Sequence, residues 1–368
     1  MIIYLTYNDL PSGIFSSQVI DVVNFYKQEL NAKVRLVSLI SLRHFLKNKN
    51  KIIKECPDAI VLPMFPGVHR WKFNFWLLIF VFYFFKPTKI IGRSVLATQL
   101  ALRFQKENCQ IIYDGRGAIS AEWHEYNVVN SNYLKDNIHI WEKEVVLKSN
   151  FRIAVSNQLI HYWQKEFNYF SNNHVIIPCT LNQIYNHVDL SPESIFNSRK
   201  KLGLSEKNVV FVYSGSLAGW QSFHLLYNFI APILISNPNY KILFLSDIDS
   251  NISRLQSEFG SQVLATKVSP KEVPDYLKVA DYGILIREES ITNKVASPVK
   301  FAEYLACGLQ IIISNHLGDY TKFVIDHECG HLFQDFKNHI KIDKEKNKQL
   351  STMFQKKYFS TFYSTVLK

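Results

Sequence analysis

The residues best suited to chemistry lie in one segment, 284–314, which reads ILIREESITNKVASPVKFAEYLACGLQIIIS. Its apolar ends and polar centre predict a strand, a loop, a helix and a second strand. Ser297 can cap this helix, Pro298 suits its first position, and Gly308 follows its end. The free N–H groups of such a helix, directly beyond a strand, predict an anion-binding site.

Two charged residues of this helix suit a nucleotide. Lys300, in the first turn, can place a positive charge beside a diphosphate. Glu303 follows about one turn after Val299, where a carboxylate can accept hydrogen bonds from both hydroxyls of a ribose. A plain ion pair on the helix surface would explain Lys300 and Glu303 equally well, and the helix alone leaves both interpretations open.

A second group of charged residues follows a predicted strand in the first half of the chain, in the loop YDGRGAISAEWHEY. Asp114, Arg116 and Glu122 are its candidate catalytic residues, and His124 and Glu125 lie close to them in sequence. A loop this charged, directly after a buried strand, is typical of a loop that lines an active site. His124 has an equally simple interpretation as a packing residue.

Two turns in the same half add backbone positions to the candidate site. Gly13 and Ile14 are expected to form a tight turn after the first strand, where a residue without a side chain lets the backbone approach a ligand. The turn Gly92–Arg93–Ser94, between another strand and its helix, is a similar but weaker candidate.

The elements that must position these residues alternate between strand and helix, which predicts an α/β fold with parallel sheets. The expected strands are 2–7, 34–39, 59–62, 89–92, 110–113, 152–155 and 175–177, then 209–213, 241–245, 262–265, 282–286 and 310–314. The expected helices include 16–29, 95–106, 133–148, 223–234, 252–259, 271–279 and 298–307. Two Rossmann-like, doubly wound domains are therefore expected, facing a central cleft at the carboxyl ends of their strands.

A length of 368 residues suits two domains. The polar stretch Asp189–Lys207 is interpreted as the connection between them. We expect an N-terminal domain over 1–185 and a C-terminal domain over 186–353, with a final helix at 354–368 that packs back on the first domain.

Composition narrows the classes of function. The net charge of +11 favours anionic partners, but zinc-finger spacing and basic low-complexity arms are missing, so no nucleic-acid partner is expected. Five scattered cysteines and no signal-peptide pattern predict a cytoplasmic protein without disulfides or a metal site. The pair Asp247 and Asp249 has the spacing of a metal cluster, but more simply begins a loop or helix.

Two segments of the first half raise the possibility of a membrane surface. The stretch 73–85, FNFWLLIFVFYFF, is too short to span a bilayer and predicts either a buried helix or a helix that enters a membrane interface. The basic segment 43–54 suits an anionic lipid surface, or equally a solvated helix face. A peripheral position on the inner face of the plasma membrane would use both segments.

At this point the sequence resembles a family. The block SPVKFAEYLACGLQIII is similar to the donor-site signature of retaining GT-B glycosyltransferases of the family 4 type, which includes sucrose synthase-like enzymes and bacterial lipopolysaccharide or capsule enzymes. The blocks IAVSNQLIHYW, VIIPCTLN, RKKLGL, VFVYSGSLAGWQ and VPDYLKVADYGILI resemble other parts of the family in the same order. The resemblance covers almost the whole chain.

The resemblance implies a GT-B fold and transfer of a sugar from a nucleotide-sugar donor to a glycan or lipid-linked acceptor, with retention of configuration and no metal or other cofactor. It implies a surface-polysaccharide pathway, with the N-terminal domain on the acceptor side. The donor would contact Gly13, Gly215, Ser216, Arg287, Ser297, Pro298, Val299, Lys300 and Glu303. The segment that contains Thr266 and Val268, beyond a strand of the second domain, would contact the base.

The sequence departs from the family at two places. Many relatives carry a first glutamate where this chain has Val295, and Glu288 or Glu289 would have to replace it. The turn after the first strand of the second domain lacks the usual Arg and Lys, for which Lys300 and Arg287 are the expected substitutes. A nucleotide-sugar epimerase of the same fold and a non-catalytic binding or scaffold protein remain alternatives.

Overall fold

The computed structural model describes residues 1–104, 106–215, 221–336 and 342–368. The chain forms two compact units. The N-terminal unit comprises Met1–Thr180, Val295–Ser297 and Lys356–Lys368, and the C-terminal unit comprises Leu181–Lys294 and Pro298–Gln355. The sequence-based boundary at 185/186 thus falls a few residues inside the C-terminal unit.

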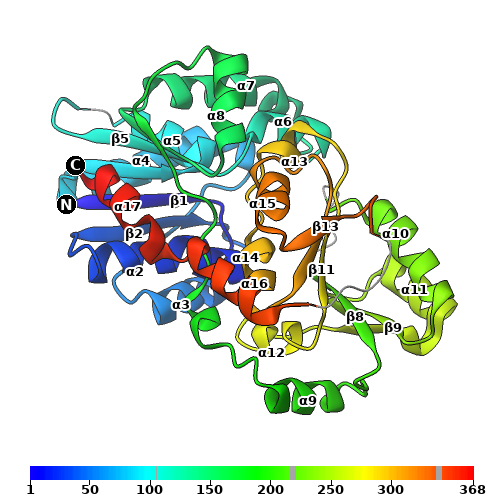
Figure 1. Cartoon of the computed structure of the whole chain (residues 1–368). Helices are drawn as coiled ribbons and strands as arrows, with labels where there is room; N and C mark the ends of the chain where they lie inside the picture. The colour runs from blue at the N-terminus through cyan, green and yellow to red at the C-terminus, as the bar shows by residue number, and fades with distance from the viewer. Residues whose placement is uncertain (105, 216–220, 337–341) are drawn as a thin grey trace. The chain divides into compact units, whose positions relative to one another are not determined.

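The N-terminal unit is built on a parallel sheet, for which the described residues give the order β3-β2-β1-β4-β5-β6-β7 (Figure 1). Its strands are β1 (Ile2–Tyr7), β2 (Val34–Ile40), β3 (Ile60–Pro63), β4 (Lys89–Arg93), β5 (Gln110–Gly115), β6 (Phe151–Ala154) and β7 (His174–Ile176). The order reverses between β1 and β4, which is the switch point of a doubly wound sheet.

Helices cover both faces of this sheet, because alternate residues of β1 present apolar side chains to opposite faces. The helices are α1 (Gly13–Phe15), α2 (Asp21–Gln28), α3 (Phe45–Glu55), α4 (Phe75–Phe85), α5 (Ser94–Leu102), α6 (Ile119–Glu125), α7 (Asn132–Lys148), α8 (Asn157–Phe167) and α17 (Ser360–Leu367). Ile3 and Leu5 pack with α4, α5, α7 and α8 on one face, whereas Ile2 and Tyr4 pack with α2, α3 and α17 on the other. Shorter turns cover Ser16–Ile20, Val68–Asn74 and Lys356–Phe359.

The C-terminal unit is a second parallel sheet, in the order β10-β9-β8-β11-β12-β13 within the described residues (Figure 1). Its strands are β8 (Val209–Ser214), β9 (Tyr240–Leu245), β10 (Val263–Thr266), β11 (Tyr282–Leu285), β12 (Gln310–Ile313) and β13 (Gly330–Leu332). Its helices are α9 (Pro192–Lys201), α10 (Phe223–Ser236), α11 (Ser250–Phe259), α12 (Val273–Leu277), α13 (Ile291–Val295), α14 (Val299–Ala306), α15 (Asp319–His327) and α16 (Lys344–Ser351). Shorter turns cover Gln183–His187, Gly260–Gln262 and Thr352–Phe354.

The prediction of two Rossmann-like parallel-sheet domains is confirmed. The stretch Asp189–Lys207, interpreted as the connection between them, lies within the C-terminal unit and contains a helix that was not predicted. Most of this stretch is helix α9, which Ser191 caps by accepting a hydrogen bond from the N–H of Ser194. The Arg199 guanidinium then ties the helix to the sheet through Asp281, at 2.9 Å. Because α9 has few apolar residues, its cap and this ion pair hold it in place. Neither of them appears in the hydrophobic pattern of the sequence, so the helix was not predicted.

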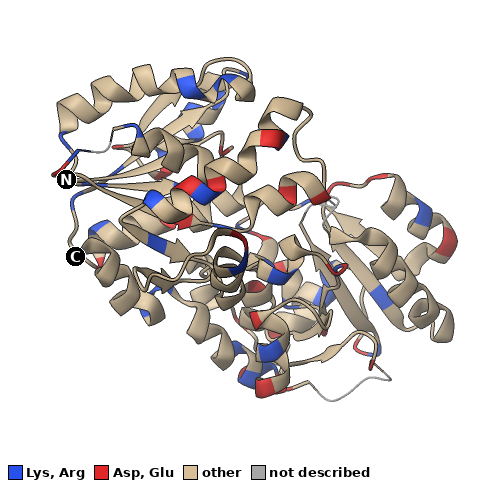
Figure 2. Cartoon of the chain, turned by 90° about the horizontal axis from the view of Figure 1, so that it is seen from above, with Lys and Arg blue, Asp and Glu red and all other residues tan. Residues whose placement is uncertain are grey.

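The apolar stretch 73–85 does not form a fully buried helix. Within α4, Leu78 and Phe82 are buried in the core, whereas Trp76, Phe80 and Phe84 are exposed. The helix has no charged residue, and Lys72 and Lys86 flank it in the sequence. Figure 2 shows the Lys and Arg residues of the chain in blue and the Asp and Glu residues in red. None of the helices formed by the described residues has the length and apolar character needed to cross a membrane.

Candidate functional site

The carboxyl edge of the C-terminal sheet brings together several of the residues predicted to bind a donor. Gly215 follows β8 directly, Arg287 lies just beyond β11, and Ser314 follows β12. The Ser314 hydroxyl donates to the carbonyl oxygen of Arg287 at 2.7 Å, and accepts from the Arg287 backbone N–H at 2.8 Å. These two bonds hold the backbone of Arg287, beyond β11, against Ser314, beyond β12, so the Cα position of Arg287 is fixed.

Lys300, in the first turn of α14, reaches the turn after β8. Its Nζ lies 4.2 Å from the centroid of the Tyr213 ring, 3.2 Å from the Gln221 side-chain oxygen and 3.6 Å from where a Cβ on Gly215 would lie. Burial lowers the pKa of Lys300 well below its usual value, and the charge of Arg287 lowers it further. An anion bound here would relieve both effects, because it would add the opposite charge beside a desolvated cation.

Arg287 is the second cation of this edge and is buried. One guanidinium nitrogen lies 3.4 Å from the side-chain oxygen of Asn293, and the His316 ring contacts the Arg287 carbonyl oxygen at 2.9 Å. Asn293 of α13 and His316, which follows β12, therefore hold Arg287 from two sides. Arg287 and Lys300 lie close enough for each to act on the other electrostatically, as a pair that neutralises one diphosphate would.

Glu303 lies one turn further along α14 and is half-buried. Burial raises its pKa to about 7, against the opposing effects of a hydrogen bond with Tyr185 and the charge of Lys300. Tyr185 is itself buried and lies in the short turn Gln183–His187. Sequence reasoning missed Tyr185, because no local pattern connects that turn with α14.

The start of α14 differs from the prediction. The helix begins at Val299 with Pro298 as its N-cap residue, and Pro298 supplies no side-chain bond to the helix. The Ser297 hydroxyl accepts a hydrogen bond from the backbone N–H of Cys179 at 2.7 Å, so Ser297 does not cap the helix as expected. A short helix of this kind offers free N–H groups but no capping side chain that would compete for them.

Val295 occupies the position at which many glycosyltransferases of the resembled family carry their first glutamate. Val295 is buried in a hydrophobic cluster of the N-terminal unit, so no carboxylate is supplied from that position. Of the two expected substitutes, Glu288 is half-buried with its backbone N–H bonded to the Ser222 hydroxyl at 2.9 Å, and Glu289 is exposed.

The residues predicted to contact a base lie beyond the edge strand β10. Thr266 is the last residue of β10 and pairs with Leu245 at the end of β9, and Val268 packs partly buried against the core. Lys267 between them pairs with Asp247. The expected contact Ser216 lies outside the described residues. Asp249, the other half of the Asp-x-Asp pattern, caps α11 by accepting from the N–H of Ile252, as expected of a helix start.

In the N-terminal unit the predicted loop residue Asp114 is buried rather than open to solvent. The Tyr4 hydroxyl donates to one of its oxygens at 2.5 Å, and the guanidinium groups of Arg93 and Arg116 approach it at 3.6 and 3.4 Å. Arg93 also reaches Asp9 at 3.5 Å. The position of Asp114 suits a residue that holds two arginines in place at the carboxyl edge of the sheet, and the weaker sequence candidate Arg93 belongs to this cluster.

Glu122 lies on α6, the short helix that follows this cluster. Burial raises its pKa, and the neighbouring Glu125 raises it further. The first turn of α6 is held by the buried Glu142, whose oxygens accept from the N–H groups of Ile119 at 3.1 Å and Ser120 at 2.7 Å. Burial raises the pKa of Glu142 to about 8 in spite of these bonds. Sequence reasoning did not identify Glu142, which is hidden within the long helix α7.

His124 and Gly13 have local roles. The His124 ring contacts the carbonyl oxygen of Ser120 one turn earlier in the same helix. Gly13 is the first residue of α1, capped by Ser12, so the predicted tight turn is wrong and a helix starts there instead. The helix continues through a π-helical segment, Ser16–Ile20, before α2.

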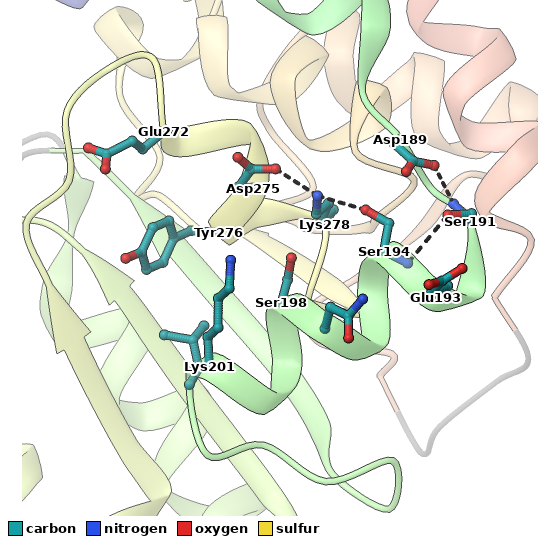
Figure 3. Close-up of a pocket in the computed structure, with 12 residues that line it drawn as sticks. Asp189, Ser191, Glu193, Ser194, Ser198, Lys201, Glu272, Asp275, Tyr276 and Lys278 are labelled. Atoms are coloured by element: carbon teal, nitrogen blue, oxygen red, sulfur yellow. Dashed lines mark hydrogen bonds and ion pairs between the residues drawn. The ribbon is translucent and has the colours of Figure 1, made fainter.

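A separate cavity of about 540 Å³ lies between α9 and the segment 272–278 (Figure 3). Lys278 bridges its two sides, with its Nζ 2.6 Å from Asp275 and 3.0 Å from the Ser194 hydroxyl. Because α9 is tied to Asp281, directly before β11, the cavity lies at the amino ends of the strands and contains none of the predicted site residues. Across the described parts of the chain no three His, Cys, Asp or Glu side chains are grouped to hold a metal ion.

No protein-family profile and no curated protein sequence matches the chain. Solved structures do match over its whole length. A glycosyltransferase from Rickettsia africae has a TM-score of 0.67 at 14% identity, covering 100% of this chain and 98% of that one. WaaG, a glycosyltransferase involved in lipopolysaccharide biosynthesis, has 0.63 at 12%, covering 99% and 94%. The UDP-GlcNAc 2-epimerase from Neisseria meningitidis has 0.55 at 10%, covering 99% and 94%. The chain therefore has the two-domain GT-B fold, which transferases and epimerases share.

Proposed function

We propose that this protein is a glycosyltransferase that moves a sugar from a nucleoside diphosphate to an acceptor hydroxyl. The observation that carries the proposal is the grouping of Lys300, Arg287 and Glu303 at the carboxyl edge of the C-terminal sheet, beside Gly215. Two cations suit a diphosphate, and a carboxylate one turn away suits the ribose hydroxyls. The likeness to solved glycosyltransferases supports the same assignment at the level of the fold.

Lys300 and Arg287, rather than a bound metal, balance the charge of the departing diphosphate. The bond between the anomeric carbon and the phosphate oxygen breaks, the acceptor oxygen bonds to the same carbon, and the departing phosphate takes the acceptor's proton. Fixed positive charges stabilise the developing negative charge at low cost in reorganisation. The resemblance of the segment 297–313 to the retaining signature supports retention of configuration.

The acceptor is a glycan or lipid-linked glycan of a surface polysaccharide, such as lipopolysaccharide or capsule, built on the cytoplasmic side of the membrane. It binds to the N-terminal unit, where Arg93, Arg116 and Glu122 lie at or follow the carboxyl edge of the sheet. The raised pKa of Glu122 suits a group that exchanges a proton or hydrogen bond with an acceptor hydroxyl. Likeness to a structure of lipopolysaccharide biosynthesis supports this pathway.

The test is a panel of nucleotide sugars, first in thermal shift and then in turnover. A donor at about 100 times its dissociation constant adds about 2.7 kcal/mol of stability. Lys300→Ala should abolish the shift, and Lys201→Ala, a lysine at the distant cavity, is the matched control. Product formation that requires an acceptor, with the anomeric configuration of the donor kept in the product by NMR, supports the proposal.

An epimerase is the second candidate, favoured by its shared fold. Conversion of a nucleotide sugar into its epimer without acceptor would replace the transferase proposal by this one. Donor binding without any turnover, across a panel of glycan and lipid-linked acceptors, would instead favour a non-catalytic binding or scaffold protein.

A further inference from the structure

An unusual set of aromatic side chains covers the outside of α4 and the turn before it. Phe73 is 54% exposed, Trp76 64%, Phe80 75%, Tyr83 73% and Phe84 79%. We call these five residues the aromatic face. Their spacing of three, four and then three or four positions places them on one side of a helix. A contiguous apolar surface of this kind on a folded protein marks an interaction site.

The opposite side of the same helix is firmly packed, so the aromatic face is a surface and not a loosely attached segment. Leu78 and Phe82 are fully buried in the core, and the Phe82 ring lies 4.7 Å from that of Phe104. Trp71, one turn before the helix, is fully buried against Trp141. The same helix therefore contributes Leu78 and Phe82 to the core and exposes the aromatic face on its other side.

Basic side chains predominate around the aromatic face. From residue 59 to residue 106 the sequence contains seven Lys or Arg and no Asp or Glu, although Arg93 lies in the buried cluster around Asp114 and the carboxylate of Glu144 acts on Lys72. Arg70 and Lys86 are exposed at the two ends of the helix, and Arg103 and Lys106 are exposed beside the packed rings of Trp71 and Phe104. Lys72 lies over the rings of Trp71, Tyr133 and Trp141 at 5.5–5.9 Å.

The basic segment 43–54 is not part of this surface. Most of it forms α3, whose buried residue Ile52 packs with α2 and α17. The core residues of α4 pack on the other face of the sheet. The two segments therefore pack on opposite faces of the sheet, and each must be tested alone.

We propose that the aromatic face docks on the surface of a lipid bilayer with anionic headgroups, with α4 lying parallel to the membrane plane. Trp and Tyr suit the boundary between headgroups and acyl chains, and Phe suits the layer just below it. The surrounding cations match anionic headgroups. A second copy of the chain fits less well, because pairing this surface with itself would bring the exposed cations Arg70 and Lys86 of two molecules together.

The docking goes beyond the proposed transferase activity and does not depend on it, but it gives the candidate acceptor side an orientation. The Asn74 side-chain amide, where α4 begins, lies 3.5 Å from the hydroxyl of Tyr7 at the carboxyl end of β1, and its oxygen accepts from the Phe65 N–H at 2.9 Å. The membrane-facing helix thus starts at the same sheet edge as the cluster around Asp114. A lipid-linked acceptor would reach that edge without leaving the bilayer.

The experiment is flotation of the full chain with vesicles of phosphatidylcholine alone or with about one third phosphatidylglycerol. The double variant Trp76→Ala with Phe80→Ala should lower binding to the anionic vesicles at least about tenfold. Phe170→Ala is the matched control, because Phe170 is 75% exposed elsewhere in the same unit. A variant with Lys47, Lys49, Lys51 and Lys54 changed to glutamine tests α3 separately and should bind within about threefold of wild type.

Contact is measured by quenching of tryptophan fluorescence with brominated phosphatidylglycerol, which should be lost in Trp76→Phe while flotation persists. Thermal melts check that each variant folds, as expected for side chains this exposed. The proposal fails if the folded wild type ignores anionic vesicles at low salt, or if only the α3 variant loses binding. It fails equally if the wild type is a dimer that the double variant converts to monomer, because the aromatic face would then be covered by a second copy.

Discussion

Replacing Glu303 with glutamine tests two effects of its buried carboxylate. The ionised carboxylate should lower the stability of the folded protein, and it should strengthen binding of the donor. Burial raises the pKa of Glu303 from its usual 4.5 to about 7. The folded state therefore holds this proton more tightly than the unfolded state, and the stability of the wild type falls as the pH rises from about 4.5 to about 7. The difference between the two pKa values corresponds to about 3 kcal/mol of unfolding free energy.

Glutamine has the same shape, stays uncharged and still accepts the hydrogen bond of Tyr185. Glu303→Gln should therefore be more stable than the wild type by up to about 3 kcal/mol at pH 8, with the gap closing toward pH 4.5. The same change should weaken binding of the donor's nucleoside at least about tenfold at pH 8, because an ionised carboxylate accepts both ribose hydroxyls more strongly than an amide oxygen.

Thermal melts from pH 4.5 to 8 and calorimetric titration with the nucleoside measure the two effects. Glu193→Gln, an exposed glutamate on α9, is the matched control and should change neither. If Glu303→Gln is no more stable than the wild type at pH 8, the burial argument is refuted. If it is more stable but binds the nucleoside as well as the wild type does, Glu303 has no role in donor binding.

Three further substitutions and one control test the phosphate site and the N-terminal cluster. Lys300→Ala and Arg287→Ala should each weaken binding of the nucleoside diphosphate more than binding of the nucleoside in calorimetry, and equal weakening would argue against a phosphate contact. Tyr4→Phe should lower unfolding free energy by about 1–3 kcal/mol in urea melts, because Asp114 loses its shortest hydrogen bond. Tyr26→Phe should cost little, since that buried hydroxyl has no hydrogen-bond partner within the described residues; an equal loss in both variants would contradict the reasoning.

Hydrophobic pattern was enough to predict most of the fold. The first strand, Ile2–Tyr7, has the predicted bounds, because a short run of mainly apolar and aromatic residues is typical of a buried strand in a parallel sheet. The helix α9 was missed because its stability comes from Ser191, Pro192 and Arg199 rather than from an apolar stripe. The short strand β13 was missed because Gly330–Leu332 has too few residues to show a period.

The candidate site was predictable only where its residues lie close in sequence. Arg287, Lys300 and Glu303 belong to one segment, and the structure brings them together. Tyr185 and Tyr4 were not identified, because each meets its carboxylate partner through the fold and nothing near them in sequence marks the contact. The burial of Asp114 was missed for the same reason, since a charged residue after a strand gives no sign of what covers it.

The segment Lys356–Lys368 makes the N-terminal unit depend on residues that follow the C-terminal unit in sequence. It follows the whole C-terminal unit in sequence, yet Tyr363 packs against the rings of Phe25 and Tyr26, at 5.2 and 5.4 Å, in the core of the N-terminal unit. During synthesis the first unit therefore leaves the ribosome with one face of its sheet incomplete, and waits for nearly the entire chain before that face closes. The C-terminal unit itself extends to Gln355, so the two units are completed by neighbouring stretches of the chain and close at almost the same stage of synthesis.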